Sequence, residues 1–409
     1  MKRMFEITCT VITPLFMGGA SQQPELRTQS INGILRWWFR AAGGSLEDEK
    51  RIFGWAGETS NQGVVRIFIK DLDKLQKEKF SKEFDSSGRV RQDNGINYIG
   101  FSLDQRFRRD QKDKIQREYI KENQSFDIKI FFHPKATESD IKKFFCSLWL
   151  AFNLGNFGSR ARRGFGSIKI EKIVYESKNI TNDCYGLDFI PDDDVKYWTM
   201  INLVKIKEIL SPKPRDNLPY LFDNNFEIYL VQKSNFKNIN SWRNEVQRGR
   251  RGNYLKNSWS GNNINNWNEL LDFMGFLLMA YRSYRQPDYN TAKNILQSNP
   301  VNNNLIFERA IFGLPLNFYF SSIRKGAMVH LNQETQTLRR ASPLLIKIVQ
   351  NRRNNYEGLF IVMKSTFMPT NSNLTFSGKR VYLPNNQWVA LDDFVSSLQT
   401  KNLVRKIYP

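Results

Sequence analysis

The alternation of apolar and polar residues predicts a β-strand at the start of the chain. In MFEITCTVIT, the apolar positions Phe5, Ile7, Cys9 and Val11 alternate with polar residues, as in a strand buried on one face. The loop PLFMGGASQQPELRTQ follows, and INGILRWWFRAAGG then has the apolar spacing of a helix, with Ser30 as its predicted N-cap. The N-terminal segment therefore predicts a strand, a long loop and a helix.

The same two periods continue to about residue 175. They predict strands at VVRIFI and SFDIKIFF, a helix at ESDIKKFFCSLWLAFNLG, and a further strand after the glycine-rich segment that follows. A highly charged stretch from about Asp71 to Asn123 predicts an insertion of solvated helix or disorder. Apart from this insertion, the order is that of a split βαβ unit, which predicts a ferredoxin-like domain.

The second half of the chain also mixes strands and helices. The acidic, turn-rich segment SKNITNDCYGLDFIPDDDVKYW predicts a boundary, with one domain at 1–178 and another at 179–409. Strands are predicted in NFEIYLV, LPLNFYFSS, PLLIKIV and GLFIVMKS, and helices in WNELLDFMGFLLMAYRSYR and LDDFVSSLQTK. Arg51-Ile52-Phe53-Gly54 is echoed by Ile311-Phe312-Gly313, with Arg309 shortly before. We predict an α+β fold of two ferredoxin-like (RRM-like) domains with helical insertions.

Composition points to a polyanionic partner. The chain has 409 residues, with 61 Lys+Arg against 40 Asp+Glu and a formal net charge of +21, so nucleic acid is the leading partner class. The three cysteines, Cys9, Cys146 and Cys184, have no spacing typical of a disulfide framework or a zinc site, which favours a reducing cytoplasm. No apolar stretch approaches the length of a membrane span. We expect no cofactor, no metal and no membrane contact.

The segment LGNFGSRARRGFGSIKI is the first candidate site, here called the glycine loop (154–166). Its order of helix, loop and strand is the reverse of a nucleotide-binding Walker loop, and it lacks a complete Gly-x-Gly-x-x-Gly. We predict that it binds RNA through close backbone approach, phosphate-binding arginines and base-stacking rings, at Phe157, Gly158, Ser159, Arg160, Arg162, Arg163, Gly164 and Phe165. The alternative is a turn with surface arginines.

Further basic groups are predicted to extend this surface. In the first loop and helix they are Gly18, Gly19, Arg27, Arg36 and Arg40, although Arg36 and Arg40 could instead anchor acidic segments. RNEVQRGRRGN has a composition common both in RNA-contacting segments and in solvated linkers, and it contains Arg248, Arg250 and Arg251. Two later groups could line a second RNA track: Arg324 with Lys325, and Arg339 with Arg340.

The sequence resembles the RAMP proteins of CRISPR effector complexes, and in particular the family of subunit one of the type III-B Cmr complex. The first loop and helix, TPLFMGGASQQPELRTQSINGILRWWFRA, and GSRARRGFGSI are specific in combination. IFGWAGETSNQGVVRI, YIGFS, FGLPLNFYF and RRASPLLIKI add to the resemblance. It implies ferredoxin-like domains and a non-catalytic subunit that contacts the 3′ part of the guide RNA, target RNA and other Cmr subunits.

Two other functions remain open. A CRISPR RNA-processing endonuclease of related fold would cut without metal, using a histidine or a Lys/Tyr pair. The chain has only His133 and His330, each at a position typical of an ordinary strand residue, and no carboxylate cluster at metal-ligand spacing. A scaffold subunit that binds its neighbours through exposed aromatic residues is the third possibility, and it is compatible with RNA binding.

Overall fold

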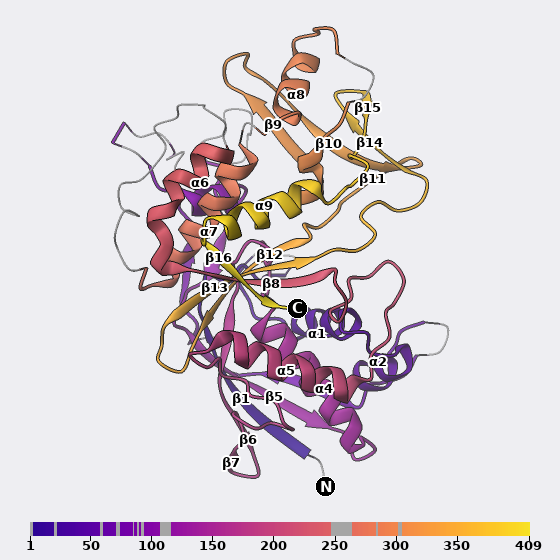
Figure 1. The fold of residues 1–409 in the computed structure, drawn as a ribbon. Helices are drawn as coiled ribbons and strands as arrows, with labels where there is room; N and C mark the ends of the chain where they lie inside the picture. Colours follow the sequence, from indigo (N-terminus) through magenta and orange to yellow (C-terminus); the bar gives the residue numbers. More distant parts are fainter. Residues whose placement is uncertain are drawn as a thin grey trace.

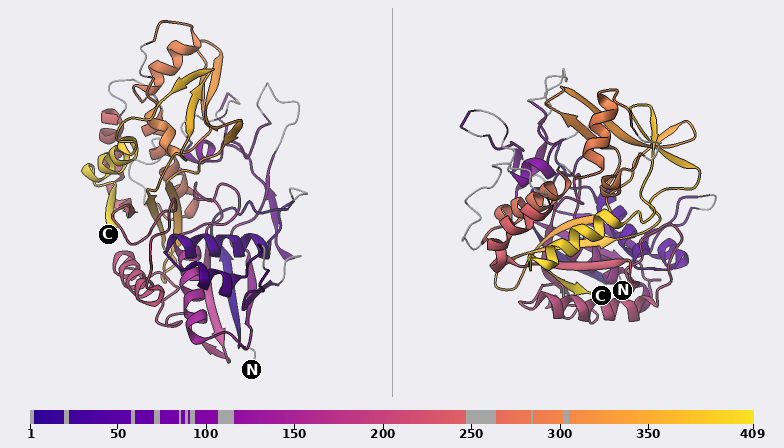
Figure 2. Two further views of the ribbon diagram at one scale, coloured as in Figure 1. Left: turned by 90° about the vertical axis from the view of Figure 1, so that its right-hand side faces the viewer. Right: turned by 45° about the horizontal axis from the view of Figure 1, so that its top comes forward.

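The computed structural model describes residues 3–19, 23–57, 60–70, 74–84, 86–87, 90, 94–106, 116–246, 264–283, 285–301 and 305–409. Arg248, Arg250 and Arg251 therefore lie outside the described residues. The molecule is elongated, with the N-terminal sheet at one end and a sheet from the second half at the other (Figure 1 and Figure 2, left).

The first half contains a five-stranded antiparallel sheet in the order β2-β5-β1-β6-β7. Its elements are β1 (Arg3–Val11), α1 (Thr28–Ala41), α2 (Leu46–Phe53), β2 (Val65–Ile69), β5 (Ser125–Phe132), α4 (Glu138–Asn153), β6 (Ile168–Tyr175) and β7 (Lys178–Asn179). The predicted strands and helices of this half are confirmed. Helix α1 begins at Thr28 with Arg27 as its N-cap, so the prediction of Ser30 was wrong by one turn.

The charged insertion is folded against the second half where it is described. It contains β3 (Lys77–Lys79), α3 (Gly95–Ile99) and β4 (Glu118–Ile120), with β3 and β4 paired. The Asp272 carboxylate accepts hydrogen bonds from the backbone nitrogens of Gly95, at 2.7 Å, and Ile96, at 3.3 Å. A Cβ on Gly95 would lie 1.9 Å from the Asp272 carbonyl oxygen. This part of the insertion is thus a tightly docked element, which the expectation of solvated helix or disorder missed.

The second half is built on a four-stranded antiparallel sheet in the order β12-β13-β8-β16. Its strands are β8 (Phe226–Val231), β12 (Leu344–Gln350), β13 (Tyr356–Met363) and β16 (Val404–Tyr408), and its helices are α5 (Val195–Leu210), α6 (Ile239–Val246), α7 (Trp267–Arg282), α8 (Asp288–Leu296) and α9 (Val389–Thr400). Two short 3₁₀ helices lie between these elements, η2 (Lys233–Asn238) before α6 and η4 (Glu308–Phe312) after α8. A distal sheet contains β9 (Leu316–Phe320), β10 (Lys325–Gln333), β11 (Gln336–Leu338), β14 (Ser372–Phe376) and β15 (Lys379–Val381).

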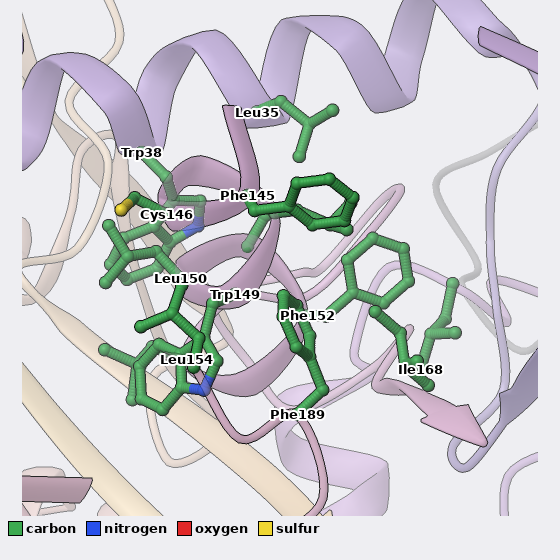
Figure 3. Packing of buried hydrophobic residues seen from close by; sticks show 14 of the residues in the cluster. Leu35, Trp38, Phe145, Cys146, Trp149, Leu150, Phe152, Leu154, Ile168 and Phe189 are labelled. Carbon is green, nitrogen blue, oxygen red and sulfur yellow. The ribbon is translucent and has the colours of Figure 1, made fainter. Parts of the chain in front are cut away.

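The four-stranded sheet is buried on both faces, and one face packs on the first half. Ile228, Leu359 and Ile361 belong to the same apolar cluster as the residues of α1, α4 and α5. Alternate residues such as Phe360 and Val362 face the cluster around α7 and α9. Figure 3 shows the first-half side of this core, where Trp149, Phe145 and Phe152 of α4 pack beside Leu35 and Trp38 of α1. Each such side chain contributes roughly 1.5–3 kcal/mol by leaving water.

The short repeated motif, Ile52-Phe53-Gly54 and Ile311-Phe312-Gly313, has a similar local structure in both places. Gly54 ends α2 with φ +86°, and Gly313 ends η4 with φ +117°. In each case an arginine three or four residues before the glycine pairs with an aspartate in the first turn of another helix: Arg51 with Asp140 at 2.9 Å, and Arg309 with Asp288 at 3.5 Å. The strand that follows is β2 of the first sheet after Gly54 and β9 of the distal sheet after Gly313, so the likeness is confined to the turn and its ion pair.

Candidate nucleic-acid interface

The glycine loop and the loop between β1 and α1 lie side by side, as expected from the sequence. The backbone nitrogen of Ser159 donates to the Phe16 carbonyl at 2.7 Å, and that of Gly166 donates to Pro14 at 3.0 Å. The Thr13 hydroxyl also donates to the Gly164 carbonyl at 2.8 Å. These bonds hold both loops at one end of the first sheet.

A hollow of about 390 Å³ separates the outer parts of the two loops. Its lining includes Gly18 and Gly19 from one loop, Gly158 and Ser159 from the other, and Ser30 of α1, with Arg117 beside them. Helix α1 begins at this hollow without a side-chain cap and without an acidic residue in its first turn. No side chain of the helix itself therefore compensates the positive end of its dipole, which favours an anion, although Glu118 also lines the hollow.

The glycines of the loop are required by the packing of the protein on itself. Gly158 has φ +81°, and a Cβ there would lie 2.5 Å from the Phe16 carbonyl oxygen. Gly164 has φ +85°, and a Cβ there would lie 2.4 Å from a methyl group of Leu271. Both glycines are thus required where protein packs on them, while approach of RNA to the backbone at Gly158, which also lines the hollow, stays a prediction.

The two phenylalanines of the loop are core residues. Phe157 and Phe165 have no exposed surface. Phe157 packs on Phe152 with ring centroids 4.8 Å apart, and Phe165 packs edge-on to Phe16 at 5.5 Å. Neither ring presents a face to solvent, so the prediction that they stack on bases was wrong. The intervening turn places both rings under the loop instead of on its surface.

The three arginines of the loop reach from the first half towards neighbouring elements. Arg160 donates from Nε to the Ser102 hydroxyl at 3.1 Å. Arg162 donates to the Ser342 carbonyl and lies over the Trp37 ring at 5.3 Å. Arg163 donates from Nη2 to the Phe312 carbonyl at 3.0 Å, while its Nη1 is buried without a hydrogen-bond partner among the described residues.

These side chains meet two arginines of the second half, Arg282 and Arg340. We call the five residues the arginine junction: Arg160, Arg162, Arg163, Arg282 and Arg340. Burial, with the nearby Arg282 charge, lowers the pKa of Arg163 to about 9. Burial and Arg340 together lower the pKa of Arg162 to about 10. The guanidinium groups thus repel one another in a partly desolvated place.

The partners of the junction arginines are uncharged groups. Arg282 lies over the rings of Tyr98 and Phe312, at 5.8 and 5.5 Å. Its Nε is buried and unpaired among the described residues. Arg340 donates to the Thr366 carbonyl and lies over Phe367 at 5.7 Å. Sequence reasoning missed Arg282, because a single arginine in the last turn of an apolar helix gives no signal of its neighbours.

Arg36 and Arg40 have a structural partner instead of a place in the hollow. Both approach the Glu49 carboxylate of α2, at 3.0 and 3.8 Å, and Arg215 binds the same group at 2.8 Å. Glu49 is 2% exposed, so the three guanidiniums hold a buried carboxylate. Both therefore have a structural role, and their contact with RNA stays a prediction. Neither acidic segment proposed as the alternative anchor supplies this partner.

The remaining predicted residues lie apart from one another. Arg27 pairs with Glu25 at 3.2 Å beside the hollow. Arg324 occupies the turn between β9 and β10, where Lys325 donates to the Leu296 carbonyl at 3.1 Å. Arg339 is exposed. Of the two later basic groups, only Arg340 is brought to the glycine loop, so the structure does not align them as one track.

The titratable groups found in catalytic sites have ordinary structural positions here. Burial raises the pKa of the Cys9, Cys146 and Cys184 thiols, which lie in the core. His133 follows β5 at the surface, and His330 lies within β10. Within the described ranges, no three His, Cys, Asp or Glu side chains are arranged to hold a metal ion. No helix in this part of the chain is long and apolar enough to cross a membrane.

Comparison with known proteins agrees with this architecture. The family model of the RAMP superfamily matches residues 8–169, which contain the end of β1, the loop after it, α1 and the whole glycine loop. A relative from Pyrococcus furiosus, CRISPR system Cmr subunit Cmr1-2, is 33% identical over 176 residues, covering 40% of this chain and 92% of its own length. The chain belongs to the RAMP superfamily.

Its relatives within that superfamily are Cmr1 subunits of the CRISPR Cmr system. Cmr1-1 of Pyrococcus furiosus is 26% identical over 377 residues, which cover 89% of this chain and 88% of the relative. The crystal structure of apo Cmr1 from Pyrococcus furiosus superposes with a TM-score of 0.54 at 20% identity, covering 99% of this chain and 98% of that one. The similarity thus extends over both halves of the fold.

Proposed function

We propose that this chain is a non-catalytic subunit of a cytoplasmic type III-B Cmr ribonucleoprotein and that it binds single-stranded RNA, contacting the 3′ part of the guide RNA, target RNA, or both. Other Cmr subunits are its protein partners. Its homology to Cmr1 subunits supports the complex. Four strands lie in an equivalent order in the two sheets, β2-β5-β1-β6 in the first half and β12-β13-β8-β16 in the second. This shared order supports two ferredoxin-like domains at 1–178 and 179–409.

The observation that carries RNA binding is the arginine junction beside the hollow. Five guanidiniums contact hydroxyl, carbonyl and aromatic groups, whereas other arginines of the chain, such as Arg309, pair with carboxylates. Concentrating positive charge in a desolvated place costs free energy, and an entering phosphate would offset that cost. The uncapped start of α1 adds backbone donors at the same hollow.

Binding of a fluorescein-labelled single-stranded RNA to the full chain tests this proposal. We expect Arg160→Gln with Arg340→Gln to weaken binding and to reduce the slope of log K against log salt by about 1.4, because each lost phosphate contact accounts for roughly 0.7. The control is Arg353→Gln with Arg405→Gln, which removes the same charge from exposed positions elsewhere. Equal slopes in the two double variants would refute the role of the junction.

A nuclease assay on the same preparations separates the proposed subunit from an endonuclease. We expect the chain to leave RNA intact with or without divalent metal, and His133→Ala with His330→Ala to retain RNA binding. Specific cleavage products that disappear in the histidine variant would instead support metal-independent catalysis.

A further inference from the structure

The outer face of the first sheet carries aromatic and basic side chains side by side. Alternate residues of β2 and β5 share this face, and the register places Arg66 opposite Phe131 and Phe68 opposite Lys129. Phe68 is 50% exposed although it is a large apolar residue in a strand. Its ring meets Phe131 edge-on, with centroids 5.5 Å apart. The inward residues of β5, by contrast, pack into the core below.

A broad hollow of about 610 Å³ lies over these residues. Phe68 and Phe131 line it together with three cations, Arg66, Lys70 and Lys129, and its lining includes no carboxylate. Two carboxylates lie close to this lining: Glu6 of β1 binds Lys129 at 2.5 Å, and Asp127, on the same face of β5, interacts electrostatically with Lys70 and Lys129. The contact with the neighbouring Lys129 lowers the pKa of Lys70, as expected for crowded ammonium groups.

We propose that this face is a second RNA-binding surface, which stacks unpaired bases on Phe68 and Phe131 and binds the adjacent phosphates with Arg66 and Lys70. An open sheet face with aromatic residues on neighbouring strands is a platform for the bases of single-stranded RNA. Stacking tolerates any base, and it requires bases that a duplex would hide. The surface is distinct from the arginine junction, and it extends the proposed function to an additional stretch of RNA.

The charge of the lining favours RNA over a protein as the occupant. A protein docking on these two rings would have to supply carboxylates matched to the cations around them, because unpaired charges are costly to desolvate. Single-stranded RNA provides partners for the rings and for the cations at once. Its bases and phosphates alternate at a spacing that side chains of adjacent β-strands can reach. A neighbouring subunit is therefore the competing occupant that the experiment must exclude.

Substitutions at Phe68 separate stacking from apolar contact. Binding of a fluorescein-labelled 12-nucleotide single-stranded RNA of mixed sequence to the full chain is measured by fluorescence anisotropy. We expect Phe68→Ala and Phe68→Leu to weaken binding about five- to tenfold, and Phe68→Trp to preserve it, because leucine keeps the apolar surface but lacks an aromatic face. Tyr319→Ala is the control, since Tyr319 is 68% exposed on β9, in the distal sheet. Phe68→Leu with normal affinity would overturn the proposal.

Two further measurements distinguish this surface from the arginine junction. The Phe68 variants should keep the salt slope of the wild type, whereas Lys70→Gln should lower it by about 0.7. Photocrosslinking with an RNA containing 5-iodouridine should label the peptides that contain Phe68 or Phe131, also in the Arg160→Gln, Arg340→Gln background. Crosslinks confined to the glycine loop would overturn the second surface while leaving the first in place. A Phe68→Ala variant that loses a Cmr partner but retains RNA would assign the face to protein.

Discussion

The Nζ atom of Lys347 lies 2.7 Å from the carbonyl oxygen of Gly155 and thereby joins the four-stranded sheet to the end of α4. It also donates to the Phe152 carbonyl at 2.7 Å. Lys347 has no exposed surface, and burial lowers its pKa to about 7. A buried lysine thus satisfies the last carbonyls of a helix in the other half of the chain.

This lysine predicts that stability rises with pH. In the unfolded chain its pKa is near 10.4, so between about pH 7 and 10.4 the unfolded state holds more protons than the folded state. The free energy of unfolding should increase across this window by up to about 1.4 kcal/mol per pH unit. Below pH 7 the lysine is protonated in both states, so the free energy of unfolding changes least with pH there. Denaturant titrations at pH 7.5 and 9 should show this rise in the wild type and lose it in Lys347→Met.

The matched control is Lys379→Met, because Lys379 is exposed and its removal changes the net charge equally. If the wild type, Lys347→Met and Lys379→Met change in parallel with pH, the buried ammonium is not the source of the effect.

A second prediction concerns the cost of Arg163. Its Nη1 is buried and unpaired among the described residues, so a methionine of similar volume relieves charge burial and loses a single hydrogen bond, to Phe312. We expect Arg163→Met to melt at the same temperature as the wild type or higher, and to bind RNA more weakly. Differential scanning fluorimetry and anisotropy on one preparation measure both.

Alanine at the loop arginines should behave differently. The sequence predicts that alanine at Arg160, Arg162 and Arg163 leaves stability almost unchanged, but the structure changes this expectation. Arg162 and Arg163 fill space between the halves, so alanine leaves gaps there and should lower the melting temperature. A methionine variant as unstable as the alanine variant would mean that the charge itself stabilises the junction.

A third prediction concerns the contact between the insertion and α7. Gly95→Ala places a methyl group 1.9 Å from the Asp272 carbonyl oxygen, so α3 must move away from α7. We expect a loss of about 1–3 kcal/mol, as for other overpacked sites. Gly33→Ala is the control, since a Cβ at this exposed position of α1 meets nothing within 4 Å. Alanine there should stabilise by about 0.5–1 kcal/mol. Similar unfolding curves for both variants would contradict the docked arrangement.

Sequence periodicity predicts most of the fold, because apolar spacing records which side of an element is buried. The alternation in β1 and β5 is reproduced by their burial, and the continuous apolar runs of β12 and β13 belong to strands covered on both faces. Periodicity fails in the insertion, where α3 is only five residues long and docks through the backbone of Gly95 together with Ile99.

The candidate site is harder to predict, because residue type does not reveal a side chain's partner. Arg36 and Arg160 look alike in the sequence, yet one holds a buried carboxylate and the other a serine hydroxyl. Phe165 and Phe68 both lie in basic surroundings, but only Phe68 reaches the surface. The neighbours that decide these roles come from segments far away along the chain, and only the three-dimensional arrangement supplies them.

The packing of the four-stranded sheet of the second half on the first half has a consequence for folding during translation. The first half leaves the ribosome while the strands that will cover α1 and α4 are still missing. Its apolar face therefore remains in water until β8, β12 and β13 have been made and have paired, since these strands carry most of the residues that cover it. Contacts across so long a separation form slowly. The nascent chain thus exposes an apolar surface until β13 at Tyr356–Met363 has been synthesised, long after the first half that this strand helps to cover.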